Sequence, residues 1–214
     1  FMPRCAEIPV AIFAIHKLGG VYVPLDPSYP GDRVKGMMEA AGAEHLLTIE
    51  CMAASARVAS SVTYLDRDWP LIEYLATTHE YEPAEPSPDD IAYLMFTSGS
   101  TGTPKGVPIQ HRALVNYCHA YLNHARLGPR DRIAGFSSIS FDVAAEELFP
   151  TLVAGAALIY RRDDLMYTPT VFNEWISSEG ITLVTVPTAY WHEWIAGIDQ
   201  AGEAIPSGVH TCLL

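Results

Sequence analysis

The sequence predicts an α/β fold in which mostly parallel strands are covered by helices. Two observations support this prediction. Helical and strand-like segments alternate along most of the 214 residues. The segment 91–96 is apolar throughout, which is typical of a strand buried on both faces. Alternation of this kind indicates a parallel sheet, and ligands of such sheets bind at the carboxyl ends of the strands.

The first 78 residues are expected to form one α/β lobe. Its helices are closed by glycines, at 7–18 before Gly19-Gly20 and at 32–41 before Gly42. Its short strands are expected at 21–23, 45–49 and 62–65, and one further short helix is expected at 52–59.

A connector follows at 79–90, where three prolines and five acidic residues favour an exposed, extended chain. The second lobe, 91–214, is expected to carry a phosphate loop and a substrate pocket. The chain ends on the apolar run 211–214, which has the pattern of an interrupted strand, so we expect a fragment that is truncated at its C-terminus.

The second lobe is expected to alternate strictly between strands and helices. Thr168 is the expected N-cap of a helix that begins at Pro169, and Pro150 is expected to break another helix. The predicted strands are 91–96, 132–138, 157–160 and 181–186, and the other predicted helices are 112–126, 143–154 and 188–196.

Composition excludes several classes of function. Lysine and arginine number 13 against 25 acidic residues, for a net charge of −12, which disfavours binding to nucleic acid or anionic lipid. No apolar run reaches the length of about 20 residues that a membrane span needs. Four cysteines without a Cys-x-x-Cys pair indicate reduced thiols in a cytosolic protein, and no zinc spacing is present.

The loop after the apolar strand has the chemistry of a phosphate site. Residues 97–106 combine small residues with Lys105 and with the hydroxyls of Thr97, Ser98, Ser100 and Thr101. Such a loop offers backbone N–H groups, hydroxyls and a positive charge to a triphosphate. A flexible linker seldom leaves a buried strand and ends in Pro-Lys-Gly. The Walker A spacing and the Gly-x-Gly-x-x-Gly pattern are both absent, so neither a P-loop nor a Rossmann site is supported.

Three segments together resemble the adenylate-forming enzymes. The segment 93–107 is similar to their phosphate-loop signature, and 17–30 is similar to an upstream signature of nonribosomal peptide synthetase adenylation domains. Phe141-Asp142, followed by Glu146, Glu147 and Leu148, resembles the next downstream signature. The order is that of the family, and the resemblance covers nearly the whole chain.

The resemblance implies an activity and its cofactors. Such a domain activates an amino acid with Mg-ATP, forms an aminoacyl-adenylate, releases pyrophosphate and loads a phosphopantetheine thiol on a carrier domain. It implies catalytic roles for Lys105 and Thr101. The implied phosphate contacts are Thr97, Ser98, Gly99, Ser100, Thr101, Gly102, Thr103 and Lys105. The glutamate that holds Mg²⁺ lies outside this chain, so no metal ligand is assigned and the fragment alone is expected to be inactive.

The implied substrate pocket comprises Asp142, Val143, Glu146 and Thr185. Asp142 would pair with the substrate's α-ammonium, because a buried ammonium needs a counter-charge. Alternatively, Asp142 caps the helix that begins near Val143, with Glu146 and Glu147 favouring its positive end. Glu146 would face a cationic side chain, accept a hydrogen bond from a polar one, or be a solvated helix residue.

Three functions remain open on the sequence. The first is an amino-acid adenylation domain in a large, cytoplasmic synthetase with neighbouring domains, of the kind that makes secondary metabolites. The second is another adenylate-forming ligase, similar to acyl-CoA synthetases, that acts on an acid without an α-amine. The third is a truncated, non-catalytic scaffold. Phe141-Asp142 argues against the second, and the complete phosphate loop argues against the third.

Overall fold

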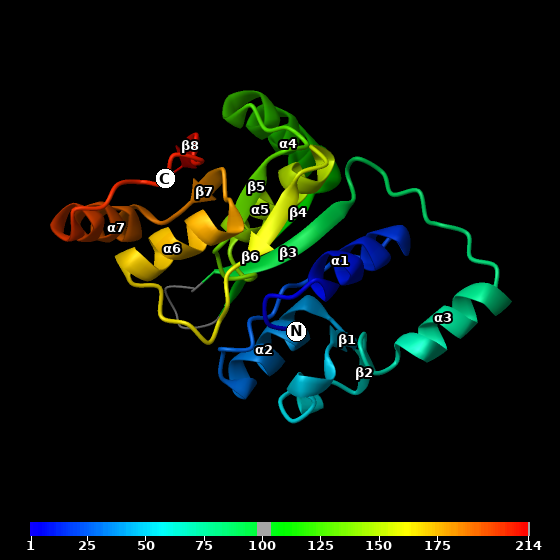
Figure 1. Cartoon of the computed structure of the whole chain (residues 1–214). Coiled ribbons are helices and arrows are strands. Elements are labelled where there is room, and N and C mark those ends of the chain that lie inside the picture. Colours follow the sequence, from blue (N-terminus) through cyan, green and yellow to red (C-terminus); the bar gives the residue numbers. More distant parts are fainter. Residues whose placement is uncertain (98–103, 214) are drawn as a thin grey trace. The chain divides into compact units, whose positions relative to one another are not determined.

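The computed structural model describes residues 1–97 and 104–213 (Figure 1). The chain forms two compact units, Phe1–Val115 and Asn116–Leu214. Helix α4 (His111–Ala125) begins in the first unit and continues in the second.

The first unit contains two small sheets and three complete helices among its described residues. Strands β1 and β2 pair in parallel, whereas β3 and β4 pair antiparallel. The elements are α1 (Glu7–Lys17), α2 (Gly31–Ala41), β1 (His45–Thr48), β2 (Ser61–Tyr64), α3 (Trp69–Thr78), β3 (Ile91–Thr97) and β4 (Lys105–Gln110).

Helices α1 and α2 lie where the sequence predicted them. Helix α2 ends at Gly42, whose φ of 64° lies in the left-handed region that glycine adopts readily. The face of α2 that carries Val34, Met37 and Met38 is buried in a core that also contains Phe96 of β3. This packing anchors the strand that leads to the phosphate loop.

Four local predictions for this unit were wrong or incomplete. Segment 21–23 forms one parallel bridge, Tyr22 to Tyr93, because Pro24 has no N–H to extend the pairing. Two 3₁₀ turns, Glu50–Met52 and Ala56–Val58, replace the expected helix at 52–59. Helix α3 was missed, although a proline in its first turn is typical of a helix start. Strand β4 was missed because glycine and proline interrupt its pattern.

The second unit is a four-stranded parallel sheet with helices between its strands, which confirms the predicted α/β class. The strand order is β6-β5-β7-β8. Its elements are β5 (Arg132–Gly135), α5 (Asp142–Val153), β6 (Ala157–Tyr160), α6 (Pro169–Glu179), β7 (Leu183–Thr185), α7 (Thr188–Ala201) and β8 (Thr211–Leu213).

The strand order places a topological switch point between β5 and β7. From β5 the chain crosses through α5 to β6 on one side, and from β6 it crosses through α6 to β7 on the other side of β5. Loops that leave two such neighbouring strands diverge, and a crevice forms at their carboxyl ends. Here those ends are the loop that leads from β5 to Asp142 and the last residue of β7, Thr185.

Helix α5 runs through Pro150 without the predicted break. Proline removes one backbone donor, but the helix hydrogen bonding resumes, with Ala154 N donating to Pro150 O at 2.9 Å. The hydroxyl of Thr151 donates to the carbonyl of Glu147 in the same turn. The predicted start of α6 is confirmed, because Thr168 Oγ1 accepts a hydrogen bond from Val171 N.

An aromatic cluster packs beneath the loop that follows β5. Phe172 of α6 is fully buried, and its ring lies 5.2 Å from that of Phe136 and 4.9 Å from that of Trp194, centroid to centroid. Helices α6 and α7 therefore share one core (Figure 1). Since Phe136 directly follows β5, this core fixes the start of the loop that leads to Asp142.

Candidate functional site

The β3–β4 hairpin brings the two ends of the predicted phosphate loop together. Thr97 and Lys105 are cross-strand partners, and Thr97 Oγ1 donates to the Lys105 carbonyl at 3.4 Å. Both residues are exposed. The residues between them that were predicted to contact phosphate, Ser98, Gly99, Ser100, Thr101, Gly102 and Thr103, lie outside the described residues. A hairpin that ends in exposed threonine and lysine suits an anion, because hydroxyl and ammonium groups both donate hydrogen bonds.

Asp142 is the first residue of α5, and Phe141 is the N-cap. The Asp142 carboxylate therefore does not stand at the capping position that the alternative interpretation required. Its Oδ1 accepts a hydrogen bond from Val143 N at 3.0 Å, and the side chain is exposed. Val143 itself is half-buried.

Glu146, one turn further along α5, is held by a residue that the sequence analysis missed. Tyr117 of α4 donates its phenolic hydrogen to Glu146 Oε2. Burial and this hydrogen bond both raise the pKa of Tyr117 well above its usual range. The phenol therefore stays protonated at neutral pH and remains a donor to the carboxylate.

Thr185, at the carboxyl end of β7, is buried and lies beside a second tyrosine of α4. The hydroxyls of Tyr121 and Thr185 are 3.4 Å apart. Burial raises the pKa of Tyr121 to about 12, so this hydroxyl also stays protonated at neutral pH. The rings of Tyr121 and Tyr117 are 6.0 Å apart, centroid to centroid.

The second unit thus brings three of the four predicted substrate residues into one neighbourhood. The negative charges of Asp142 and Glu146 both act on Tyr117, and Tyr121 joins Thr185 to the same cluster. One signal for the two tyrosines was present in the sequence: they are four residues apart, and this spacing places both on one face of a helix.

Glu147 adjoins Glu146 but has a different environment. It is only 1% exposed, and its Oε1 accepts hydrogen bonds from Ser137 N at 3.0 Å and from Ser137 Oγ at 2.8 Å. The N–H of Phe136 donates to the same oxygen at 3.3 Å. Glu147 therefore ties the loop after β5 to α5, and it is not the surface acid at a helix end that the alternative interpretation assumed.

Comparison with known families assigns the chain to a family. Residues 1–214 match the model of the AMP-binding enzyme family. The chain belongs to that family. The resemblance to nonribosomal peptide synthetase adenylation domains is likewise confirmed by its relatives.

Two curated relatives of this chain are peptide synthases. It is 34% identical over 187 residues to tyrocidine synthase 2 of Brevibacillus parabrevis, a match that covers 87% of this chain and 5% of that protein. It is 35% identical over 213 residues to isonitrile lipopeptide synthase of Streptomyces coeruleorubidus, covering 100% of this chain and 14% of that protein. The chain thus spans a small part of these relatives.

Solved structures share the fold. The nonribosomal peptide synthetase FmoA3 matches with a TM-score of 0.80 and 26% identity over 92% of this chain and 20% of that one. Its form bound to α-methyl-L-serine-AMP matches with a TM-score of 0.78 and 25% identity over 97% of this chain and 22% of that one. VinN in complex with L-aspartate, at 22% identity, has a TM-score of 0.81 over 99% of this chain and 54% of that one.

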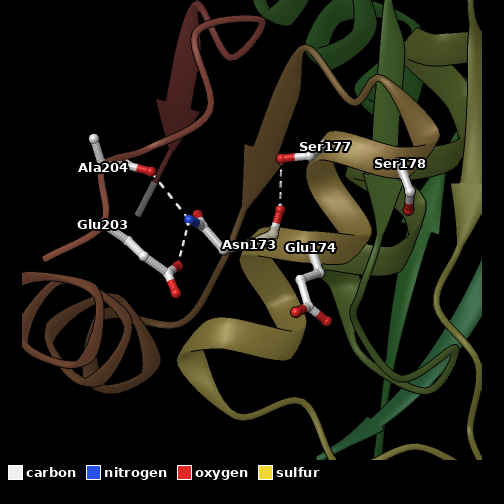
Figure 2. Close-up of a pocket in the computed structure, with 6 residues that line it drawn as sticks. All are labelled: Asn173, Glu174, Ser177, Ser178, Glu203 and Ala204. Carbon is white, nitrogen blue, oxygen red and sulfur yellow. Dashed lines mark hydrogen bonds between the residues drawn. The ribbon is translucent and has the colours of Figure 1, made fainter. Parts of the chain in front are cut away.

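A separate depression of about 610 Å³ lies between α6 and the segment after α7 (Figure 2). Its central residue, Asn173, donates to Glu203 Oε2 at 2.9 Å and to the Ala204 carbonyl at 3.0 Å, and its Oδ1 accepts from Trp194 Nε1 at 3.4 Å. These hydrogen bonds join α6 to the segment that follows α7, so Asn173 has a structural role.

Within residues 1–97 and 104–213, no three histidine, cysteine, aspartate or glutamate side chains gather in a way that suits a metal ion. The helices in that part of the chain are too short or too polar to span a bilayer.

Proposed function

We propose that this chain is the N-terminal core portion of an amino-acid adenylation domain in a nonribosomal peptide synthetase. In the reaction, a carboxylate oxygen of the amino acid attacks the α-phosphorus of ATP, and pyrophosphate leaves. The thiol of a phosphopantetheine arm on a carrier domain then takes the aminoacyl group, and AMP leaves. Neighbouring synthetase domains would be further partners.

The observation that carries this proposal is the position and charge of Asp142. It lies at the switch point of a parallel sheet, where ligands of such sheets bind. Within the described residues, neither Asp142 nor Glu146 forms an ion pair with the protein. A carboxylate without a protein cation is suited to the α-ammonium of an amino acid.

The residues at the end of the β3–β4 hairpin have their own assignment. Thr97, Lys105 and the loop between them would hold the ATP phosphates, with Lys105 and Thr101 stabilising the negative charge during displacement. Mg²⁺ would neutralise the triphosphate, with its glutamate ligand supplied by residues beyond this chain. On the substrate side, Asp142 would bind the α-ammonium, while Val143, Glu146 and Thr185 would line the side-chain pocket.

Amino-acid-dependent exchange of pyrophosphate into ATP tests the proposal on the full-length protein that carries these residues. With a panel of amino acids and plain carboxylic acids, we expect exchange with one or a few amino acids. The variant Asp142→Asn should lose at least about a hundredfold in kcat/KM for the amino acid, because an ammonium would lose its only counter-charge. The KM for ATP should change little.

The variant Asp199→Asn, an identical change at an exposed position of α7, serves as the matched control. Exchange with plain acids alone would move the protein to the second class of adenylate-forming ligases. Absence of exchange with every acid tested would favour a non-catalytic scaffold.

A further inference from the structure

Tyr117 and Glu146 are 29 positions apart in the sequence and meet through a single hydrogen bond between α4 and α5. The phenol donates to only one carboxylate oxygen, Oε2. A carboxylate can accept at both oxygens, so Oε1 retains its capacity for another donor. Among the described residues no ion pair uses Glu146, although the residue is half-buried.

A second tyrosine joins the same face of α4 to another of the proposed substrate residues. Tyr121, one turn further along α4, is buried and reaches Thr185 of β7. One face of α4 therefore contacts both Glu146 and Thr185, which are proposed to line the side-chain pocket. Residues that contact substrate-binding side chains in this way commonly fix the orientation of those side chains.

The charges around Tyr117 are of one sign. Asp142 and Glu146 are four residues apart on α5, where like charges repel. Both carboxylates make the electrostatic potential at Tyr117 more negative. A bound molecule with two cationic groups, at a spacing that matches one helical turn, would relieve this repulsion.

We propose that Tyr117 is a positioning residue that holds one oxygen of Glu146, so that the other oxygen binds the cationic side chain of a basic amino acid. This rests on the proposed function, in which Asp142 binds the α-ammonium of the same substrate. The substrate class is thus amino acids with an amine or guanidinium side chain, of the size of ornithine, lysine or arginine.

The variant Tyr117→Phe tests this role because it keeps the ring and removes only the donor. In the full-length protein, we expect KM for the preferred basic amino acid to rise about tenfold, with kcat and the KM for ATP nearly unchanged. Glu146→Gln should raise the same KM by more. The double variant should be no worse than Glu146→Gln alone, since Tyr117 acts through Glu146.

Tyr74→Phe, the same change at an exposed tyrosine of α3, is the matched control for folding and handling. A purely structural tie between α4 and α5 would behave differently: activity with every amino acid would fall together, and the two single changes would add. Either of those results overturns the positioning role.

A second measurement needs no variant. Non-hydrolysable sulfamoyl analogues of lysyl-adenylate and norleucyl-adenylate differ only in the terminal ammonium, and we expect the wild-type protein to be inhibited at least tenfold more tightly by the lysyl compound. Equal inhibition, or exchange driven only by an uncharged or acidic amino acid, would reject the substrate class while leaving the proposed function intact. Exchange driven only by acids without an α-amine would reject both.

Discussion

The adjacent acids Glu146 and Glu147 illustrate how much a side chain's role depends on its side of a helix. Glu146 is half-buried and accepts a hydrogen bond from a tyrosine, whereas Glu147 is buried and accepts hydrogen bonds from Phe136 and Ser137 in the loop after β5. The family resemblance could assign Glu146 to the proposed substrate pocket. It could not reveal that Glu147 organises the loop, because the partner N–H groups are about ten residues away and belong to irregular backbone.

Replacement of Glu147 should weaken this loop strongly. Glu147→Ala removes the buried acceptor of hydrogen bonds from Phe136 and Ser137, so we expect the free energy of unfolding to fall by about 1–3 kcal/mol. Glu147→Gln, which keeps one acceptor oxygen, should cost less. Urea unfolding measures the first effect, and hydrogen exchange at the Ser137 amide locates it. Unchanged exchange at that amide in Glu147→Ala would contradict the assigned role.

His16 should make the first unit sensitive to acid. Burial lowers the pKa of His16 below its ordinary value of 6.5. The hydrogen bond between His16 Nε2 and the Ala92 carbonyl raises this pKa, whereas the nearby His111 lowers it further. The unfolded chain therefore binds the proton first, so this contribution to stability is complete above pH 6.5 and is lost as the pH falls through the folded-state pKa.

Unfolding midpoints in urea between pH 7.5 and 5 measure this effect. The variant His16→Gln should show a shallower decline with acidification than the wild type, and His192→Gln, at an exposed site of α7, should follow the wild type. A decline of equal steepness in His16→Gln would show that the pH dependence arises elsewhere.

At the scale of elements, the sequence indicated those whose pattern is local. Helices α1 and α2, which are followed by glycines, were predicted to within one residue at each end. The start of α6 at Pro169 was also predicted correctly. Strand β4 was missed because it is defined by its pairing with β3 and its own sequence has no clear strand pattern. Helix α3 was missed although its sequence is apolar and has a proline in the first turn. Elements defined by distant partners are the ones that sequence pattern misses.

The packing of α7 on α6 yields a prediction from one glycine. A Cβ atom added at Gly197 of α7 would lie 2.5 Å from Pro169 Cβ, and the proline ring cannot rotate away. Gly197→Ala should therefore lower the free energy of unfolding by about 1–3 kcal/mol. Gly36→Ala in α2 meets nothing within 4 Å and should raise it by about 0.5–1 kcal/mol. Thermal and urea unfolding of both variants decide the matter, and a stabilised Gly197→Ala would contradict this packing.

At the scale of the whole molecule, motif order was the most informative property of the sequence. Three motifs in family order indicated the class of enzyme, and the family match over residues 1–214 confirms it. The site was only partly foreseeable, because Tyr117 and Tyr121 belong to no motif and take their role from where α4 packs. Position in the fold, and not residue type, identified them.

The 214 residues alone are expected to show no amino-acid-dependent exchange, because the chain spans a small part of its relatives and the resemblance implies a Mg²⁺-binding glutamate that these residues do not include. Exchange by the isolated chain above the level of a heat-treated sample would contradict this expectation.

The central claim is that Asp142 recognises an α-ammonium, and one measurement tests it most directly. Pyrophosphate exchange by the full-length protein would be compared for its best amino acid and for the same acid without the α-amine. We predict exchange with the amino acid, at least about a hundredfold less with the deamino acid, and loss of that preference in Asp142→Asn. Equal exchange with both acids by the wild-type protein would contradict the account.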